Sequence, residues 1–506
     1  MTELTIIGGA GGFQASYEDM LTQSRVMTET GDLLVGRSRT VGAIAAAGEL
    51  LESGVIVPDR LPITVAKIGL AATGPDGLLV VGGSLSVSGR VTEACLHTYT
   101  WIDQAARDLL EGVQLTAGYV LGLSLVPLTL IGAGGLAVLA VQNPALAAAL
   151  AAQLDRGAIL SAVDRTLYDH PWLTEALTRM LPGAIPGFAL GLTGPLAPLL
   201  TLASGGNWPP SNYEESLSGL IALLGHGGLL HDSGSYTVGD PTHPPREVAL
   251  TPDNAVAEIF NQQELMDTYW DPEDGAYAKR EDWKASSQVQ IITVFDEAGD
   301  PQGYVVQLPG TEDWGLARGS NLTDMSSNIK MMSQQTTLSM AVVTEALRKA
   351  GIDPGSQVPL MLTGHSQGGI TAASLAQDSD FVRDFSVTSV VTGGAPIGRM
   401  DIDASVHVLS LEHEQDPVTK LDGQSNPDRS TWTTVRRSSP PEEAIPAGGS
   451  APSASGTHYG HAYVDTGRLV DASDDASIIA WREHNAAFLT GHRVTAVQYE
   501  VIRDDD

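Results

Sequence analysis

The pattern of hydrophobic and polar positions divides the chain into two parts. In the first part apolar residues recur mostly at three- and four-residue steps, as over residues 88–113, and this spacing is typical of helices. In the second part short apolar runs alternate with amphipathic segments, which is typical of an α/β sheet. We therefore expect a mainly helical, apolar domain over residues 1–235, a Pro-rich linker over 236–253 and an α/β domain over 254–506.

The apolar runs of the second part predict strands, and its amphipathic segments predict helices. The expected strands cover residues 289–295, 304–308, 358–362, 386–391, 406–411, 431–437 and 494–501. The expected helices cover residues 326–350, 370–376 and 474–489, and a flexible loop rich in Pro, Ser, Gly and Ala is expected over 438–457. In the first part we expect helices over 15–60 and 88–113, and a hairpin or loop over 74–90.

A long uncharged stretch over residues 112–154 leaves two interpretations open. Its centre, residues 118–141, is long enough to cross a bilayer, which would make the stretch a membrane-inserted helical hairpin. Alternatively, the stretch is the apolar interior of a soluble helical domain, because Gly, Ala, Thr and Ser interrupt the apolar runs and no Lys or Arg flanks the first edge.

The charge and the cysteine content limit which binding partners and which cellular location we expect for this protein. The formal net charge of −32, from 60 acidic and 28 basic residues, argues against nucleic acid and against attraction to anionic lipid. The single cysteine, Cys95, cannot form an internal disulfide. The N-terminus lacks a basic region followed by a long apolar run, so we expect no Sec or Tat signal peptide and a cytoplasmic or otherwise secreted protein.

The candidate chemistry lies in the segment Gly364-His365-Ser366-Gln367-Gly368, between a predicted strand and a predicted small-residue helix. A sharp strand-to-helix turn would present the Ser366 hydroxyl as a nucleophile and force this residue into a strained backbone conformation. Side chains at positions 364 and 368 would collide there, so glycine is needed at both. The turn would also aim the backbone N–H of Gln367 at a developing oxyanion.

At this turn the sequence resembles the α/β-hydrolase superfamily, and more narrowly its lipase-like branch. Gly-His-Ser-Gln-Gly is close to the Gly-His-Ser-x-Gly of lipases. The segment Leu308-Pro309-Gly310-Thr311 is similar to the end of the oxyanion strand in lipases of the fungal triacylglycerol type, with Pro309 in the place of an Arg. The resemblance covers roughly residues 285–490 and implies an esterase or lipase of the serine type in which Thr311 is an oxyanion donor opposite Gln367.

The superfamily order of nucleophile, acid and histidine implies the other two members of a triad. Asp416 follows the strand expected over 406–411 and is the implied acid, with Glu412 and Glu414 as competitors. The implied base is His458, which precedes a tyrosine by five residues, with His461 as the alternative. The expected chemistry is acyl transfer without a cofactor, and the histidines are not spaced like the ligands of a metal such as zinc.

We expect hydrolysis of carboxylic esters, with a lipid or other small-molecule ester as the substrate. The alternative is a non-catalytic interaction or membrane-active protein that uses the hydrolase fold as a scaffold. Tyr99 and Asp103 form a Tyr-x-x-x-Asp pattern around Trp101, which resembles the export signal of actinobacterial type VII secretion substrates. The same pattern also fits a plain helix with Tyr99 buried and Asp103 in solvent, so contact with that secretion machinery is one of two expectations.

Overall fold

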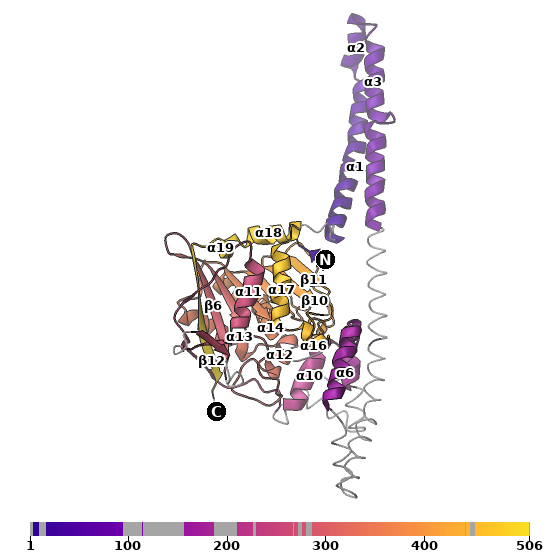
Figure 1. Cartoon of the computed structure of the whole chain (residues 1–506). Helices are drawn as coiled ribbons and strands as arrows, with labels where there is room; N and C mark the ends of the chain where they lie inside the picture. The colour runs from indigo at the N-terminus through magenta and orange to yellow at the C-terminus, as the bar shows by residue number, and fades with distance from the viewer. Residues whose placement is uncertain are drawn as a thin grey trace. The chain divides into compact units, whose positions relative to one another are not determined.

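The computed structural model describes residues 4–9, 17–94, 114, 156–186, 210–225, 229–266, 268–271, 276–279, 286–440, 442–445 and 451–504 (Figure 1). The chain divides into two compact units. One comprises Phe13–Gly112, and the other comprises Met1–Gly12 together with Val113–Asp506. This division does not coincide with the domain boundary expected over residues 236–253.

The smaller unit is helical. Its helices are α1 (Tyr17–Ala45), α2 (Gly48–Ile56) and α3 (Leu61–Thr73), and residues 78–94 are also helical. The expectation of a hairpin or loop over 74–90 is therefore wrong for most of that stretch. Its glycines allow two helices to approach closely, because a Cβ on Gly82 would lie 2.7 Å from the carbonyl oxygen of Gly31 in α1.

Small residues lie inside this unit and large apolar ones lie outside. Ser24 and Ser86 are buried, whereas Val55 and Ile56 at the end of α2 are 88% and 83% exposed. Among the described residues one stretch, Leu61–Ala94, is long and apolar enough to cross a membrane, judged by length and composition alone. The uncharged stretch 112–154, apart from residue 114, and the Tyr99–Asp103 pattern lie outside the described residues.

A mixed ten-stranded sheet organises the larger unit, in the order β1-β11-β10-β9-β8-β7-β6-β12-β2, with β3 paired to β12. Strands β7 to β11 are mutually parallel, and β1, β6, β12 and β2 are antiparallel to their neighbours. The strands are β1 (Leu4–Gly8), β2 (Tyr236–Pro241), β3 (Arg246–Glu247), β6 (Ser287–Phe295), β7 (Pro301–Leu308), β8 (Leu360–His365), β9 (Val387–Gly393), β10 (His407–His413), β11 (Trp432–Arg437) and β12 (Arg493–Arg503). A separate hairpin joins β4 (Thr268–Asp271) and β5 (Ala276–Lys279).

Helices cover both faces of this sheet. One hydrophobic core lies under α12 (Met325–Met332), α13 (Leu338–Lys349), α14 (Gln367–Gln377) and α15 (Ser379–Phe385). The core on the opposite face lies under α11 (Ala255–Leu265), α17 (Gly460–Asp471), α18 (Ala476–His484) and α19 (Ala486–Leu489). Figure 1 shows α11 and α17 side by side, and the Asp471 carboxylate accepts the N–H groups of Val256 and Ala257 at the start of α11.

Three further helices contact the loops at the carboxyl ends of the parallel strands: α6 (Arg156–Asp169), α7 (Trp172–Arg179) and α10 (Tyr213–Gly225). In α6, Asp164 accepts hydrogen bonds from the Ser455 N–H and hydroxyl, in the short helix α16 (Ala454–Thr457). In α10, the Tyr213 hydroxyl donates to the Leu421 carbonyl in the loop after β10. These helices were expected in a separate N-terminal domain, and they pack on the α/β unit instead.

Other expectations also differ from the structure. The expected linker 236–253 contains strands β2 and β3, whose partner β12 lies at the far end of the chain. The helix expected over 326–350 is broken into α12 and α13, because Gln334 has a positive φ of 60° and the Thr337 side chain caps α13 by accepting from the Met340 N–H. The helix expected over 474–489 is likewise divided, at Asn485.

Candidate active site

The turn between β8 and α14 holds Ser366 in the strained conformation that its sequence predicts. Ser366 has φ 55° and ψ −123°, a region that residues other than glycine rarely occupy. A Cβ on Gly364 would lie 2.1 Å from the Gly368 carbonyl carbon, and one on Gly368 would lie 2.0 Å from the Leu308 oxygen. Both glycines are therefore required by the backbone, and the turn raises the Ser366 side chain at the carboxyl end of β8.

Three side chains from distant parts of the sequence meet at this point. The Nε2 atom of His458 lies 2.9 Å from Ser366 Oγ, and its Nδ1 atom lies 2.8 Å from Asp416 Oδ2. Ser366 follows β8, Asp416 follows β10, and His458 lies between α16 and α17. The order of contacts, hydroxyl to imidazole to carboxylate, is that of a nucleophile, a general base and an orienting acid.

The alternative candidates lie elsewhere. His461 is exposed in the first turn of α17, and its ring stacks on Tyr459 at 5.8 Å. Glu412 is buried in an ion pair with Arg436 at 3.0 Å, and it also accepts from Asn426. Glu414 is exposed. The structure therefore brings Ser366 together with His458 and Asp416, and not with these three residues.

Asp416 is fully buried and accepts several hydrogen bonds. Its Oδ2 accepts from His458 and from the Tyr463 hydroxyl at 2.7 Å, and its Oδ1 accepts from the Val418 N–H at 2.8 Å. Burial acts to raise the pKa of Asp416, but His458, Tyr463 and Val418 stabilise the carboxylate more strongly and leave its pKa below the ordinary value. The acid is therefore held ionised and fixed in orientation.

Two neutral histidines surround these groups. His413 stacks on the Tyr463 ring at 4.1 Å and contacts the Thr457 carbonyl oxygen and the Thr466 hydroxyl, and burial lowers its pKa to about 4. His365 lies beside His458 with ring centroids 4.7 Å apart, and burial lowers its pKa to about 3. Both rings therefore stay uncharged near neutral pH and add no cation beside Asp416.

The end of β7 lies against the nucleophile. A Cβ on Gly310 would lie 3.6 Å from Ser366 Cβ, so the segment Leu308–Thr311 borders the place where a substrate carbonyl would bind. The Thr311 Oγ1 accepts a hydrogen bond from Asn328 Nδ2 at 2.8 Å. Gln367 is the first residue of α14, so its backbone N–H has no acceptor within that helix. These are the two groups expected to face an oxyanion.

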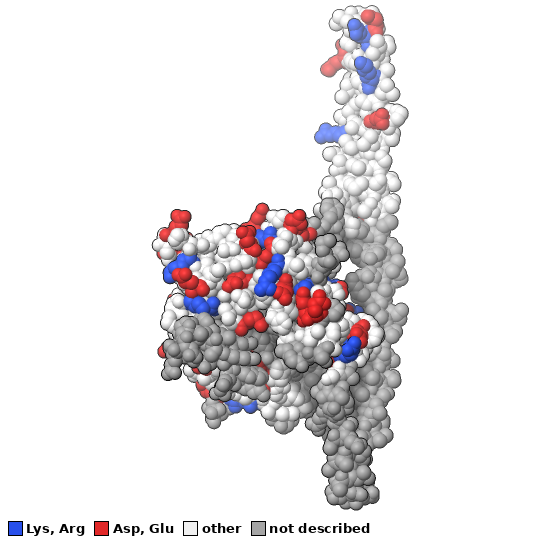
Figure 2. Space-filling view, in the orientation of Figure 1, with Lys and Arg blue, Asp and Glu red and all other residues white. Residues whose placement is uncertain are grey.

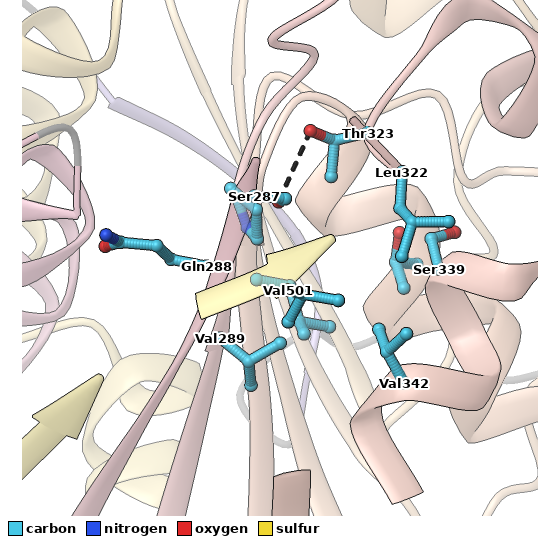
Figure 3. A pocket seen from close by; sticks show the side chains of 11 residues that line it. Ser287, Gln288, Val289, Leu322, Thr323, Ser339, Val342 and Val501 are labelled. Atoms are coloured by element: carbon cyan, nitrogen blue, oxygen red, sulfur yellow. Dashed lines mark hydrogen bonds between the residues drawn. The ribbon is translucent and has the colours of Figure 1, made fainter. Parts of the chain in front are cut away.

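Two cavities among the described residues are not lined by Ser366, His458 or Asp416. Figure 3 shows the side chains that line a small cavity between β6, β12 and α13. Its volume is about 10 Å³, and the Thr323 and Ser287 hydroxyls beside it lie 3.4 Å apart. This volume holds about one water molecule. The larger cavity, of about 190 Å³, lies beside the turn between α12 and α13 and is lined by Met331, Met340 and Met400 among others.

Among the described residues, no group of three or more His, Cys, Asp or Glu side chains is arranged to hold a metal ion. Figure 2 shows acidic side chains spread over the visible face of the α/β unit, with basic ones among them. This distribution agrees with the net charge of −32 and presents no basic surface on that face.

Comparisons with protein-family models, with curated proteins and with solved structures found no match for this chain.

Sequence reasoning missed several residues that surround Ser366, His458 and Asp416. The roles of Tyr463 and His413 depend on contacts between α17 and the end of β10, which are far apart in the sequence, and only the position of Tyr463 five residues after His458 gave a signal. Asn328 and Gln263 lie on helices and are buried, at 8% and 7% exposure. For both residues the available signal was an amide on a helix face that also carries apolar residues, because a buried amide needs a hydrogen-bond partner.

Proposed function

We propose that this protein is a serine hydrolase of the α/β-hydrolase type that cleaves carboxylic esters through an acyl-enzyme. The observation that carries the proposal is the pair of contacts made by His458, 2.9 Å to Ser366 Oγ and 2.8 Å to Asp416 Oδ2. The strained turn at Ser366 and the parallel order of β7 to β11 support the same assignment. The chain order of Ser366, Asp416 and His458 is that of the superfamily.

In the proposed reaction, Ser366 Oγ attacks the ester carbonyl carbon while His458 Nε2 takes the hydroxyl proton. Asp416 holds the imidazole in orientation and stabilises the imidazolium that forms. The backbone N–H of Gln367 and the hydroxyl of Thr311 donate to the oxyanion. His458 then returns the proton to the departing alcohol, and a water molecule, activated by the same imidazole, releases the acid from Ser366.

A lipidic ester is the substrate class that we propose. The resemblance of the Ser366 turn to lipases supports it, as does the apolar character of the N-terminal helices, with Val55 and Ile56 almost fully exposed. Because the protein carries a net charge of −32, a neutral ester is favoured over an anionic one.

Hydrolysis of short nitrophenyl esters tests the proposal. We expect Ser366→Ala and His458→Asn to abolish turnover, and the matched control His461→Asn to retain it, because His461 is exposed and contacts Tyr459. Turnover that survives Ser366→Ala, or that is lost equally in His461→Asn, would contradict the assignment.

A second candidate function is a membrane-active or interaction role for the helical unit. The stretch Leu61–Ala94 supports it, and Figure 2 shows few charged side chains on the visible face of α3. Flotation of the intact protein with vesicles of neutral lipid tests this role, with the double variant Val55→Asp, Ile56→Asp as the comparison. Flotation lost in the variant supports membrane contact, and no flotation of the wild-type protein argues against it.

A further inference from the structure

The segment Leu308–Thr311 needs to be held firmly if it is to stabilise an oxyanion. Hydrogen-bond donors in such a site act because they are already oriented before the charge develops. This segment begins at the last residue of β7 and contains Pro309, which has no backbone N–H, and Gly310, which has no side chain. Its position must therefore be fixed by groups at its two ends.

Asn328 of α12 holds the end at Thr311. Its Nδ2 donates to Thr311 Oγ1 at 2.8 Å, and the amide is 8% exposed. A hydroxyl has one proton and can accept and donate at the same time. Because Thr311 Oγ1 accepts from Asn328, its own proton remains free to be donated to an oxyanion.

Gln263 of α11 holds the other end, from the opposite face of the sheet. Its Nε2 donates to the Leu308 carbonyl oxygen at 2.7 Å, and this bond is buried. The same carbonyl lies so close to Gly368 that a Cβ there would be 2.0 Å away. The amide thus fixes the carbonyl against which the turn at Ser366 is packed.

We propose that Asn328 and Gln263 are positioning residues that clamp the oxyanion segment from the two faces of the sheet, and that Asn328 also directs the Thr311 hydroxyl proton toward the substrate. The inference rests on the proposed acyl transfer at Ser366. The two amides come from α12 and α11, which lie over separate hydrophobic cores. They act through Thr311 and Leu308 and touch no reacting atom themselves.

The substitution Asn328→Asp tests the direction of the hydrogen bond at nearly constant shape. A carboxylate can only accept, so the Thr311 proton would turn away from the oxyanion. We expect kcat on a nitrophenyl ester to fall about 100-fold, the loss typical of one oxyanion donor, while KM changes about twofold or less. An unchanged kcat, or a rise in KM alone, would overturn the role of Asn328.

A double-mutant cycle with Thr311→Val separates this role from general loss of structure. If Asn328 acts through the Thr311 hydroxyl, Asn328→Asp should lower kcat by about twofold or less once that hydroxyl is removed. Multiplied losses in the double variant would show that Asn328 acts independently of Thr311. Thermal unfolding of the four proteins identifies any variant that fails to fold, and the cycle is then repeated with Asn328→Ser.

The substitution Gln263→Leu tests the contact with the Leu308 carbonyl, and Gln262→Leu is the matched control. Gln262 is the neighbouring buried amide, but it bonds to Glu258 and Arg246, away from Ser366. We expect Gln263→Leu to lower kcat about tenfold with KM little changed, and Gln262→Leu to leave kcat within about twofold. Equal losses of kcat in both variants would overturn the clamp.

Measurements on the wild-type protein distinguish failure of the proposed function from failure of the clamp alone. If it hydrolyses no ester and takes no covalent label at Ser366, the proposed function fails. If the wild-type protein hydrolyses the ester and the Asn328 and Gln263 variants do so with the same kcat, only the proposed clamp fails.

Discussion

Gly364 and Gly368 face each other across the turn at Ser366 so closely that a Cβ on Gly364 would lie 2.1 Å from the carbonyl carbon of Gly368. No real Cβ atom tolerates this distance from a backbone atom. The two glycines are thus the steric condition for the strained φ of 55° at Ser366, a residue that is only 5% exposed.

Gly364→Ala and Gly368→Ala should each destabilise the protein by about 3 kcal/mol or more and abolish esterase activity, because backbone atoms would have to move. Denaturant unfolding of the purified variants measures the loss. The control is Gly239→Ala in β2, where the nearest atom to an added Cβ lies at an ordinary 3.5 Å. A Gly364→Ala variant as stable and as active as the control would contradict the steric argument.

Removing the Tyr463 hydroxyl should change the pH profile of ester hydrolysis more than it changes the free energy of unfolding. Tyr463→Phe deletes the 2.7 Å hydrogen bond to Asp416 Oδ2, so the carboxylate charge faces the His458 imidazole with one donor fewer. The carboxylate is then stabilised less strongly, so the pKa of Asp416 should rise and the acidic limb of kcat/KM should move to higher pH. The measurement is ester hydrolysis between pH 5 and 9, and a shift toward lower pH would contradict this role.

Acid should destabilise the fold through its buried neutral histidines. In the unfolded chain a histidine has a pKa of about 6.5, whereas burial lowers the pKa of His413 to about 4 and of His365 to about 3. Between these values the unfolded state binds more protons, so stability rises with pH and is lost as the pH falls from about 6.5 toward 4.

The variant His413→Gln tests this linkage. It should reduce the slope of unfolding free energy against pH by up to one proton, about 1.4 kcal/mol per pH unit, between pH 4.5 and 6. Its absolute stability will also fall, because contacts with Thr457 and Thr466 are lost. An unchanged slope would show that His413 does not titrate between the folded and unfolded states.

A buried ion cluster ties the end of the last strand to the start of α12. Arg503 pairs with Asp232 and Asp324 at 3.0 Å each, and all three side chains are at most 1% exposed. Arg503→Met would leave two buried carboxylates without their cation and should cost about 3 to 5 kcal/mol of stability. The exposed Arg383, which pairs with Asp380 and Asp384, is the control, and Arg383→Met should change stability by about 0.5 kcal/mol or less.

The parts of the fold that follow from local pattern could be predicted from the sequence. The apolar runs before Ser366 and Asp416 correspond to β8 and β10, and the glycines around Ser366 mark a turn whose strain the structure contains. The choice between His458 and His461 could not be made from sequence, because the two are three residues apart and only the fold decides which ring reaches Ser366.

The expectations that differed depended on long-range pairing. Strand β2 is an edge strand that ends at Pro241, so its composition resembles a linker, and its partner β12 lies about 260 residues away in the chain. The glycines of residues 78–94 resemble turn residues, but the close approach of α1 explains Gly82 and Gly89. The amides of Asn328 and Gln263 among apolar helix positions indicated burial only, since their hydrogen-bond partners belong to other elements.

The most direct test of the central proposal is covalent labelling of the intact protein with a fluorophosphonate, followed by mass-spectrometric mapping of the labelled peptide. We predict one adduct, on Ser366, that disappears in Ser366→Ala and is much reduced in His458→Asn. A wild-type protein that takes no label, or a Ser366→Ala variant that is labelled to the same extent, would contradict the account.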